Sequence, residues 1–346
     1  MRVATWQAIE TLSLDEVDSP VCGPSDVVLS VGSCGICGSD VHSYTEGVWI
    51  APGVPLGHEY AGTVTAVGSA VAGLRVGDRV AVNPAAPCGS CPRCSEERQN
   101  LCSSGSGHAG GFGDQVLVRN AVVGRHLFVL PAGFPLEEAC FLEPLSVAVR
   151  AVHHAAPPLD EPIVVFGLGT IGQCVVQVLL AAGARDVIVV DTSHRRLAAA
   201  MSAGAHEALN PASDDVATSL FASRGTTSSP YQPRSGAMGA VFECSGAAPV
   251  LPLAFSLARA AAPIAAIALA AHPLNIPVDD LVQKELRLLG SFAYTPRDCQ
   301  EAFDLLVTRR VHVRPLISHR FALADITAAF EVQRDTEASI KVVVSP

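Results

Sequence analysis

Aromatic and charged side chains are both scarce in this chain of 346 residues. Aromatic residues make up 5% of the sequence and charged residues 16%, whereas 49% of it is hydrophobic. Alanine, valine, leucine and glycine must therefore fill most of the core, and this much apolar material at this length predicts two domains. Basic residues are outnumbered as well. The formal net charge of −10 argues against nucleic acid or an anionic membrane as the main partner.

The chain also lacks an apolar signal core and an uninterrupted membrane span. Its first residues, MRVATWQAIETLSL, predict no secretion signal. Residues 251–271 are long enough to cross a bilayer, but Arg259 and Pro263 near the middle predict a helix, a break and a buried strand instead. Eleven cysteines, an odd number, indicate a reducing, cytoplasmic environment in which metal binding or packing is favoured over disulfides.

Four of the cysteines lie close together, as Cys88, Cys91, Cys94 and Cys102 in the segment CGSCPRCSEERQNLC. The spacing C-x2-C-x2-C-x7-C lets one loop close a tetrahedron of thiolates around a zinc ion, with no position left open for a substrate. Such a site stabilises a lobe and carries out no chemistry. Two disulfides, or four unrelated cysteines, are the alternatives, and they fit a cytoplasmic chain less well.

A glycine-rich turn stands between a predicted strand and a predicted helix in IVVFGLGTIGQCVVQVLLAAG. Gly167, Gly169 and Gly172 have the spacing G-x-G-x-x-G, which gives a tight turn, a close approach of the backbone to a pyrophosphate, and close helix packing. Asp191 ends the next predicted strand, where a carboxylate accepts hydrogen bonds from the adenosine ribose and repels a 2′-phosphate. The pattern predicts a dinucleotide site that prefers NAD over NADP.

Arg195 and Arg196 follow this aspartate and complicate the preference. A guanidinium at this place could bind a 2′-phosphate and so favour NADP. A solvated helix N-terminus is the simpler alternative.

Two further segments, CGICGSDVH from Cys34 and GHEYAGTV from Gly57, place a cysteine ahead of a histidine–glutamate pair. Together with VGDRVAV, the four-cysteine loop, FLEPLSVAVRAV, the glycine-rich turn and a closing KVVV strand, they resemble the zinc-dependent medium-chain alcohol and polyol dehydrogenases. Within that family the resemblance is to the sorbitol and threonine dehydrogenase branch. It covers almost the whole chain.

The resemblance implies an α/β fold with a GroES-like, β-rich catalytic domain and a Rossmann domain, which is a doubly wound parallel sheet. The catalytic domain would span 1–150 and be completed by 286–346, and the NAD-binding domain would span 151–285. The residues themselves agree with this division. Short strands separated by Gly/Pro turns dominate the first part, and strands alternate with helices in the middle.

The resemblance also implies a catalytic zinc site. Cys37 and His58 would bind the ion, and Glu59 would be the third ligand or a carboxylate just behind it. Glu143, in LEPL, would touch the zinc directly or through water, or would reach the substrate. Such a zinc keeps one exchangeable position, where a bound alcohol becomes more acidic. Ser39 and His42 stand where the family relays the proton towards solvent, although His42 could be an ordinary surface or buried histidine.

A further set of residues is assigned to the cofactor by the same resemblance, in which Arg196 would cover the adenine. These residues are Gly167, Gly169, Thr170, Ile171, Gly172, Asp191, Arg196, Ser245, Ile267, Ala268, Leu269, Ser291, Phe292 and Ala293.

We therefore expect an enzyme that binds one catalytic and one structural zinc ion and reversibly oxidises a secondary alcohol with NAD(H). The expected substrate is a polyol, cyclitol, sugar derivative or amino alcohol. Ser43 and Ala293 stand where the sorbitol pattern has an aromatic residue and an arginine, which favours a bulkier hydroxylated ring over sorbitol. An epimerase that retains NAD and a catalytically silent binding protein are the alternatives. The family implies a homodimer or a homotetramer.

Overall fold

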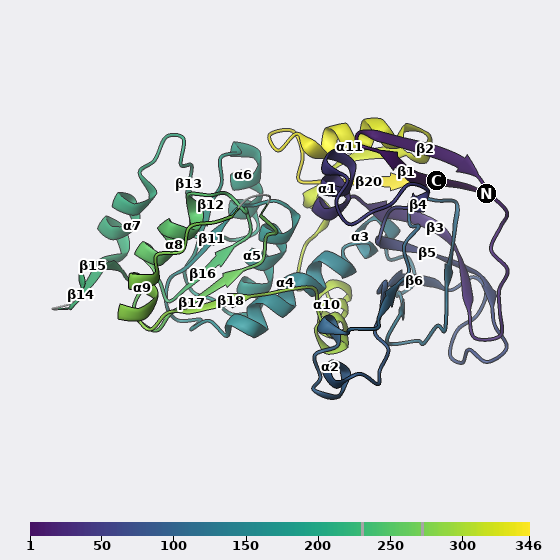
Figure 1. Cartoon of the computed structure of the whole chain (residues 1–346), viewed down its shortest axis with the longest axis horizontal. Coiled ribbons are helices and arrows are strands. Elements are labelled where there is room, and N and C mark those ends of the chain that lie inside the picture. Colours follow the sequence, from purple (N-terminus) through teal and green to yellow (C-terminus); the bar gives the residue numbers. More distant parts are fainter. Residues whose placement is uncertain (230–231, 271–272) are drawn as a thin grey trace. The chain divides into compact units, whose positions relative to one another are not determined.

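The computed structural model describes residues 1–229, 232–270 and 273–346, and these fall into two compact units (Figure 1). The first unit comprises residues 1–146 together with 294–346, and the second comprises 147–293. None of the helices formed by the described residues combines the length and the apolar character that a membrane crossing requires.

The first unit is built around a seven-stranded sheet with the order β10-β6-β5-β3-β20-β19, in which β9 also pairs with β3. The strands of this sheet are β3 (Val27–Gly35), β5 (Glu59–Val67), β6 (Arg79–Val82), β9 (Gln115–Val118), β10 (Leu127–Val129), β19 (Ile317–Ala322) and β20 (Lys341–Ser345). Two smaller sheets are formed by β1 (Arg2–Ala8), β2 (Thr11–Glu16) and β4 (Val54–Pro55), and by β7 (Ala85–Ala86) and β8 (Ser106–Gly107). The α-helices are α1 (Gly38–Glu46), α2 (Pro92–Ser95), α3 (Leu136–Ala139), α10 (Pro296–Val307) and α11 (Ile326–Arg334), and three short 3₁₀ turns span Gln99–Leu101, Arg314–Leu316 and Leu323–Asp325.

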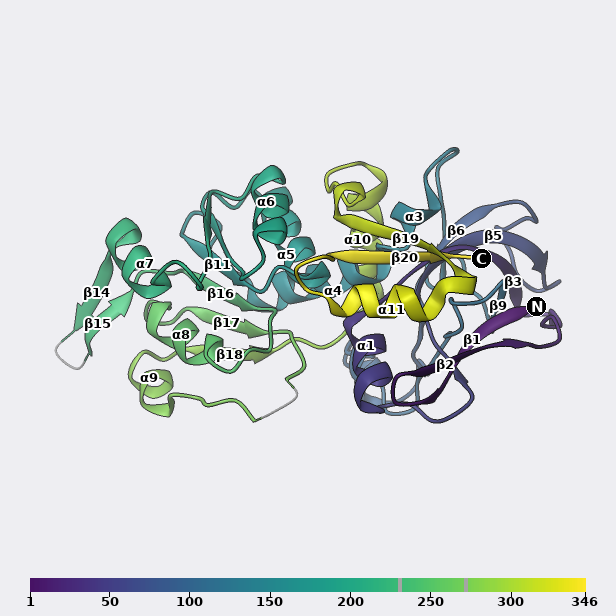
Figure 2. The ribbon, with the colours of Figure 1, turned by 90° about the horizontal axis from the view of Figure 1, so that it is seen from above.

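The end of the chain returns to its beginning in this unit. Strand β20 runs antiparallel to β3, with Val343 opposite Gly35 and Val344 opposite Cys34. Helix α11 packs along β20 (Figure 2). A buried apolar cluster joins residues from β3, β5 and β20, including Leu29, Tyr60 and Val342. The closing KVVV segment is therefore part of the same sheet as the segments that carry Cys34 and Glu59.

The second unit holds a parallel sheet with the order β13-β12-β11-β16-β17-β18. The strands are β11 (Ile163–Phe166), β12 (Val187–Val190), β13 (Glu207–Leu209), β16 (Ala240–Glu243), β17 (Pro263–Ala266) and β18 (Arg287–Gly290). The other elements are α5 (Thr170–Ala182), α6 (His194–Ser202), α7 (Val216–Arg224), α8 (Val250–Leu257), α9 (Val278–Gln283) and the hairpin β14 (Thr226–Ser229) and β15 (Gln232–Gly236), while α4 (Leu142–Ala155) begins in the first unit and ends in the second.

This order is doubly wound, as the sequence predicts. The chain starts at β11, extends on one side to β12 and β13, and then continues on the other side with β16, β17 and β18. The central strands are fully buried, because a parallel sheet covered on both faces needs continuous apolar runs. Ligands of such sheets bind at the carboxyl ends of the strands, where the strand order reverses. Here that point lies between β11 and β16.

Two expectations can be compared with these elements. The apolar window at 251–271 contains α8 from its second residue, then a break and β17, which confirms that it is not one long helix. Residue 271 lies outside the described residues. We expected the cofactor domain to end at 285, but β18 pairs with β17 from Arg287 to Gly290, so the parallel sheet continues beyond that point.

Candidate functional site

Cys37, His58 and Glu59 meet in the first unit. One potential ligand atom from each lies within 4.8 Å of those of the other two. Cys37 follows β3 as the N-cap of α1, Glu59 is the first residue of β5, and His58 directly precedes it. The β3–β5 register places Gly35 opposite Glu59, and a Cβ atom on Gly35 would lie 2.3 Å from the Glu59 Oε2 atom. Only a glycine at this position leaves room for that carboxylate.

Asp40 contacts both Cys37 and His58. Its carboxylate accepts a hydrogen bond from the Cys37 backbone N–H at 3.0 Å, and its other oxygen lies 3.5 Å from His58 Nδ1. This arrangement leaves His58 Nε2 for a metal. Burial disfavours the His58 cation, but the negative charges of Asp40 and Cys37 outweigh burial and raise the pKa of His58 well above its usual value. The local field therefore favours a cation at this position.

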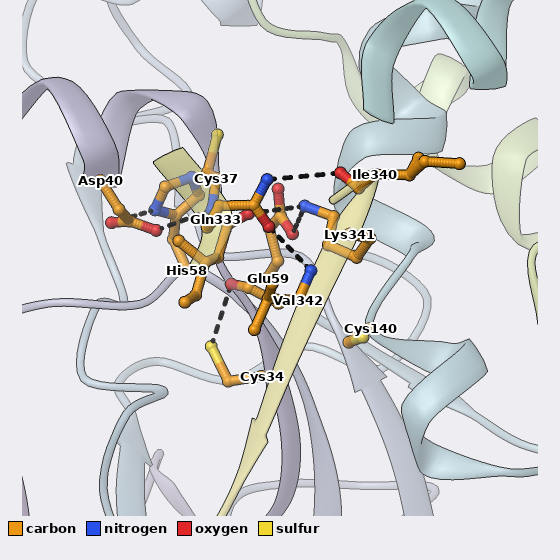
Figure 3. A network of polar contacts seen from close by, with 12 residues as sticks. Cys34, Cys37, Asp40, His58, Glu59, Cys140, Gln333, Ile340, Lys341 and Val342 are labelled. Carbon is orange, nitrogen blue, oxygen red and sulfur yellow. Dashed lines mark hydrogen bonds and ion pairs between the residues drawn. The ribbon is translucent and has the colours of Figure 1, made fainter. Parts of the chain in front are cut away.

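Glu59 is held by a buried ion pair that the sequence did not reveal. Lys341 Nζ lies 2.5 Å from Glu59 Oε2 (Figure 3). The same ammonium group donates to the Ile36 carbonyl oxygen at 2.9 Å. Both side chains are about 1% exposed. Burial disfavours the charged lysine, yet Glu59 and Cys37 raise the pKa of Lys341 above its usual value, so the lysine stays charged. One Glu59 oxygen is thus occupied by Lys341, and a metal would share the same carboxylate.

Glu143 lies near this group without joining it. It is the second residue of α4 and is absent from the set of side chains whose ligand atoms meet within 4.8 Å. Burial raises the pKa of Glu143 to about 7, while the positive charge of His58 opposes the shift and the negative charge of Glu59 adds to it. A carboxyl group of this kind can hold or release a proton near neutral pH.

Ser39 and His42 lie on α1, shortly after Cys37. His42 Nδ1 lies 2.7 Å from Glu46 Oε1, one helical turn further on, and the His42 side chain is 35% exposed. The Trp49 ring stands edge-on to the imidazole, 6.2 Å away between centroids. Trp49 adopts a left-handed backbone (φ +60°) and is 68% exposed, so it is not simple core packing. His42 is accessible to solvent, as a proton relay requires.

The four cysteines of the predicted structural site come together in the loop that connects β7 to β8. Sulfur–sulfur distances are 3.4 Å for Cys102–Cys88, 3.6 Å for Cys91–Cys94 and 3.7 Å for Cys91–Cys102. Backbone N–H groups, first that of Cys94, lower the pKa of Cys91 to about 5. The pKa of Cys88 is also lowered, first by a backbone N–H of Ser90. These groups stabilise thiolates, the form that binds zinc.

Two buried histidines lie close together after this loop, with ring centroids 5.6 Å apart. His108 directly follows β8, and His126 directly precedes β10. Burial lowers the pKa of His126 to about 4, from 6.5, and the neighbouring His108 adds to the shift. Between about pH 6.5 and pH 4, His126 therefore binds a proton in the unfolded chain but not in the folded chain. Stability should fall by up to roughly 3 kcal/mol as the pH drops from about 6.5 to about 4.

Urea unfolding across this pH range, compared between wild type and His126→Gln, tests that expectation. The glutamine oxygen can still accept the hydrogen bond that the Val122 N–H donates to His126 Nδ1 at 3.3 Å. The variant should show a shallower loss of unfolding free energy on acidification. The same pH slope in both proteins would contradict it.

In the second unit, the predicted cofactor residues gather at the carboxyl edge of the sheet. Gly167 follows β11, Ser245 follows β16, Ile267–Leu269 follow β17 and Ser291–Ala293 follow β18. Because these strands are parallel, all four segments lie at one edge. Leu269 and Phe292 are more than half exposed, so apolar side chains are available there to a ligand.

The three glycines fit a dinucleotide by their surroundings. A Cβ atom on Gly172 would lie 1.8 Å from the Gly167 carbonyl oxygen, and one on Gly167, whose φ is +81°, would lie 2.7 Å from Ser245. At Gly169, the N-cap of α5, the nearest atom would be Arg196 Nη1 at 3.9 Å. Packing requires a glycine at positions 167 and 172. Gly169 instead leaves space at the N-terminus of α5, where a phosphate binds. Thr170 and Ile171 form the first turn of α5.

Asp191 closes this turn. Its carboxylate accepts hydrogen bonds from the Leu168 N–H at 2.5 Å and from the Ser193 N–H at 2.8 Å. Arg196 lies on the first turn of α6, and its carbonyl oxygen accepts a hydrogen bond from Gln173 at 2.7 Å. The aspartate and the arginine thus both border the glycine-rich turn, as the sequence suggests.

Comparison with known proteins agrees with this geometry. Residues 23–127 match the alcohol dehydrogenase GroES-like domain, and residues 170–308 match the zinc-binding dehydrogenase model. The chain is 33% identical to D-xylulose reductase of Saccharomyces cerevisiae, over 92% of this chain and 90% of that protein. It belongs to the zinc-dependent medium-chain polyol dehydrogenase family. Members of this family are oxidoreductases that act on CH–OH groups, and the predicted fold class is thereby confirmed.

Solved structures of this dehydrogenase family superpose over the whole chain. A zinc-binding dehydrogenase from Sinorhizobium meliloti bound to NADP has a TM-score of 0.88 and 29% identity, covering 100% of this chain and 99% of that one. An alcohol dehydrogenase from Escherichia coli CFT073 complexed with NADH also has a TM-score of 0.88, with 28% identity and the same coverage.

Two site residues of this dehydrogenase were missed by sequence reasoning. Lys341 is predicted from the sequence only as part of a strand, although a lysine within an apolar run indicates a buried partner. Glu243, 1% exposed at the end of β16, accepts hydrogen bonds from Ser245 and Gly246 and so shapes the turn beside Gly167.

Proposed function

We propose that this chain reversibly oxidises a secondary alcohol of a polyol, cyclitol, sugar derivative or amino alcohol to a ketone, with NAD as the hydride acceptor. The observation that carries the proposal is the meeting of Cys37, His58 and Glu59 in a chain of this dehydrogenase family. A thiolate, an imidazole and a carboxylate within 4.8 Å of one another are a donor set suited to zinc.

These three residues would hold the catalytic zinc, and the four-cysteine lobe would hold the structural one. When bound, the catalytic zinc supplies a Lewis acid that makes an alcohol more acidic. Asp40 orients the His58 ring, and Lys341 holds the Glu59 carboxylate in place. Glu143 would face the substrate, or approach the metal through water, as a carboxyl group that titrates near neutral pH.

Ser39 and His42 would carry the released proton to solvent. Both lie on α1, immediately beyond the Cys37 ligand, so one rigid element positions metal and relay together. Glu46 accepts from or pairs with His42 Nδ1, which leaves Nε2 to exchange a proton with a hydroxyl group. This arrangement favours the relay over an ordinary surface histidine.

The dinucleotide would lie at the carboxyl edge of the parallel sheet, with its pyrophosphate at the N-terminus of α5. We propose NAD over NADP because Asp191 places a carboxylate beside the glycine-rich turn. Arg196 would then cover the adenine. One structural relative binds NADP and another binds NADH, so membership of the family does not by itself determine the cofactor.

Replacing Asp191 by serine should relax this choice. The change removes the negative charge that repels a 2′-phosphate, and Arg196 remains nearby to pair with one. We expect the ratio of kcat/KM for NAD to that for NADP to fall by roughly 10- to 100-fold, a typical value for one charge interaction. Steady-state kinetics with both cofactors measure it, and an unchanged ratio would show that Asp191 does not select the cofactor.

The substrate is proposed to be larger than sorbitol. Trp49 is exposed near His42, and Ser43 and Ala293 are smaller than the residues of the sorbitol pattern. The decisive experiment is a panel of polyols, cyclitols and amino alcohols with NAD and NADP, followed by the absorbance of the reduced cofactor. Accumulation of NADH with a secondary alcohol supports a dehydrogenase. Isomerised product without NADH would indicate the epimerase, and NAD binding without turnover would indicate a silent binding protein.

We propose further that the protein is cytoplasmic and forms a homodimer or homotetramer. All eleven cysteines are free thiols in the structure, which fits a reducing compartment. The oligomer is proposed from the family resemblance alone.

A further inference from the structure

A cavity of about 1020 Å³ lies within the first unit and is separate from the Cys37 site. Its walls are formed by β1, β2, β9, the segment that follows β8 and the turn before β10. Of the residues proposed to bind zinc, cofactor or substrate, only Cys88 of the four-cysteine lobe lines it. The volume is at the upper end of the range typical of ligand-binding cavities.

Buried polar atoms without a hydrogen-bond partner gather on the wall of this cavity. In the described part of the chain, eleven side-chain nitrogen or oxygen atoms are buried without a partner, and four of them belong to residues that line the cavity. These four are His108 Nε2, His126 Nε2, Arg125 Nε and Gln115 Oε1. Because an unpaired buried polar atom costs free energy, such atoms are rare. Their concentration on one wall indicates that a polar ligand completes their hydrogen bonds.

The two imidazole rings are neutral, and one of them presents a hydrogen-bond donor. His108 is 6% exposed and His126 is 5% exposed. Burial is the main cause that lowers the pKa of both rings, so both are neutral at pH 7. His126 Nδ1 accepts a hydrogen bond from the Val122 N–H at 3.3 Å, which places the ring hydrogen on Nε2. The His126 Nε2–H is therefore a donor without an acceptor.

Arg125 supplies a second donor and a permanent positive charge. Its Nη2 atom donates to the Pro87 carbonyl oxygen at 3.1 Å, whereas its Nε atom is buried without a partner. The carboxamide of Gln115 can turn either its oxygen or its nitrogen to a ligand. The wall thus offers a ligand two N–H donors and one adaptable group.

The charge that is available on this wall is positive. After burial, Arg119 lowers the pKa of His108, and Arg125 contributes to the lowered pKa of His126, so positive charge reaches both rings. Asp15 also lines the cavity, but its carboxylate already accepts hydrogen bonds from two neighbouring hydroxyl groups, at 2.5 and 3.0 Å. The thiolate in the four-cysteine lobe would be bound to the structural zinc. Donors and positive charge together favour an anionic ligand.

We propose that this cavity is a second binding site, which takes a small molecule that bears an oxyanion, either a carboxylate or a phosphate group. The oxyanion would accept hydrogen bonds from the His126 Nε2–H and the Arg125 Nε–H. Because these atoms are buried, the side chains must turn towards the entering ligand. The outer torsions of histidine and glutamine side chains are broad, so this adjustment costs little.

Isothermal titration calorimetry of the zinc-loaded protein tests the proposal, with NADH at saturation so that the cofactor site is filled. The probes are glucose 6-phosphate, gluconate and glucose, which carry a phosphate, a carboxylate and no charge. At least one of the anions should bind, and glucose should bind at least tenfold more weakly. Binding of one anion alone identifies which oxyanion the cavity takes. Binding of neither anion would show that the cavity holds only water, and that result, or equal binding of glucose, would overturn the proposal.

Two arginine variants locate the bound anion. Arg125→Leu removes a donor and its positive charge and should weaken anion binding by about tenfold or more, the effect of one charge-assisted hydrogen bond. Arg93→Leu is the matched control, because Arg93 lies in the four-cysteine lobe, pairs with Glu96 on the surface and does not line the cavity. It should leave the affinity unchanged. If Arg125→Leu does not fold, His108→Phe takes its place, since it keeps an aromatic ring and loses Nε2. Unchanged affinity in the cavity variant would overturn the proposal.

The Cys37→Ser variant separates this cavity from the catalytic site. It removes a proposed ligand of the catalytic zinc and changes no residue that lines the cavity. The anion should therefore bind as it does to wild type. Loss of binding would place the anion at the catalytic zinc and overturn the proposal. If wild type oxidised no alcohol of the panel, the proposed function would fail, yet the calorimetry would still decide whether the cavity binds an oxyanion.

Discussion

Replacing Cys37 by serine should abolish turnover while folding and dinucleotide binding survive. A serine hydroxyl stays protonated and cannot replace the thiolate beside His58 and Glu59, so the catalytic zinc would be lost or loosely held. A Lewis acid supplies several kcal/mol of charge stabilisation, so kcat/KM should fall by about a thousandfold or more. The glycine-rich turn lies in the other unit and depends on none of these side chains. Kinetics, zinc content and NADH fluorescence measure the three effects.

Cys94→Ser is the matched control, since it makes the same chemical change at the four-cysteine lobe. Cys94 is buried, and burial raises its pKa to about 12, so in the folded lobe it becomes a thiolate only when a metal binds. This variant should lose thermal stability or assembly before it loses chemistry. Equal loss of folding in both variants would show that the two cysteines do not serve separate sites.

Replacing Lys341 by methionine should destabilise the fold by roughly 3–5 kcal/mol, because the Glu59 charge would remain buried without its partner. The donor to the Ile36 carbonyl oxygen would be lost as well. The free energy of unfolding from urea titration of wild type and variant, both freed of metal by a chelator, measures the effect. A loss below about 1 kcal/mol would mean that Glu59 is neutral or solvated in the folded protein.

Two variants serve as controls for this ion pair. Arg334→Met removes an exposed partner of Glu10 and Glu331 and should change stability little, because water screens that pair. The double variant Glu59→Gln with Lys341→Met removes both buried charges together. It should be more stable than Lys341→Met alone, since no unpaired charge remains.

Features that depend on neighbouring residues could be predicted from the sequence. The four cysteines are close in the chain, so their spacing alone predicts the convergence that the sulfur–sulfur distances show. The glycine-rich turn is equally local: Gly167, Gly169 and Gly172 shape one strand–helix junction. The parallel sheet followed from alternating strands and helices, because parallel strands require crossovers, and its doubly wound order was implied by the family resemblance.

Features that depend on distant segments could not be predicted. The Lys341–Glu59 pair joins β20 to β5, and nothing in the KVVV segment states which carboxylate it will meet. The family resemblance predicted that Glu143 belongs to the site. It did not predict whether the Glu143 carboxylate lies within metal-binding distance of Cys37 and His58, because that depends on how α4 begins.

The central claim is that a zinc ion binds to Cys37 and His58 in the active protein. Anomalous X-ray diffraction at the zinc edge, on crystals of active and unchelated protein, tests it most directly. We predict two peaks per chain, one beside the Cys37 thiolate and the His58 ring and one within the four-cysteine lobe. A peak in the lobe alone, from crystals whose dissolved protein still oxidises its substrate, would contradict the account.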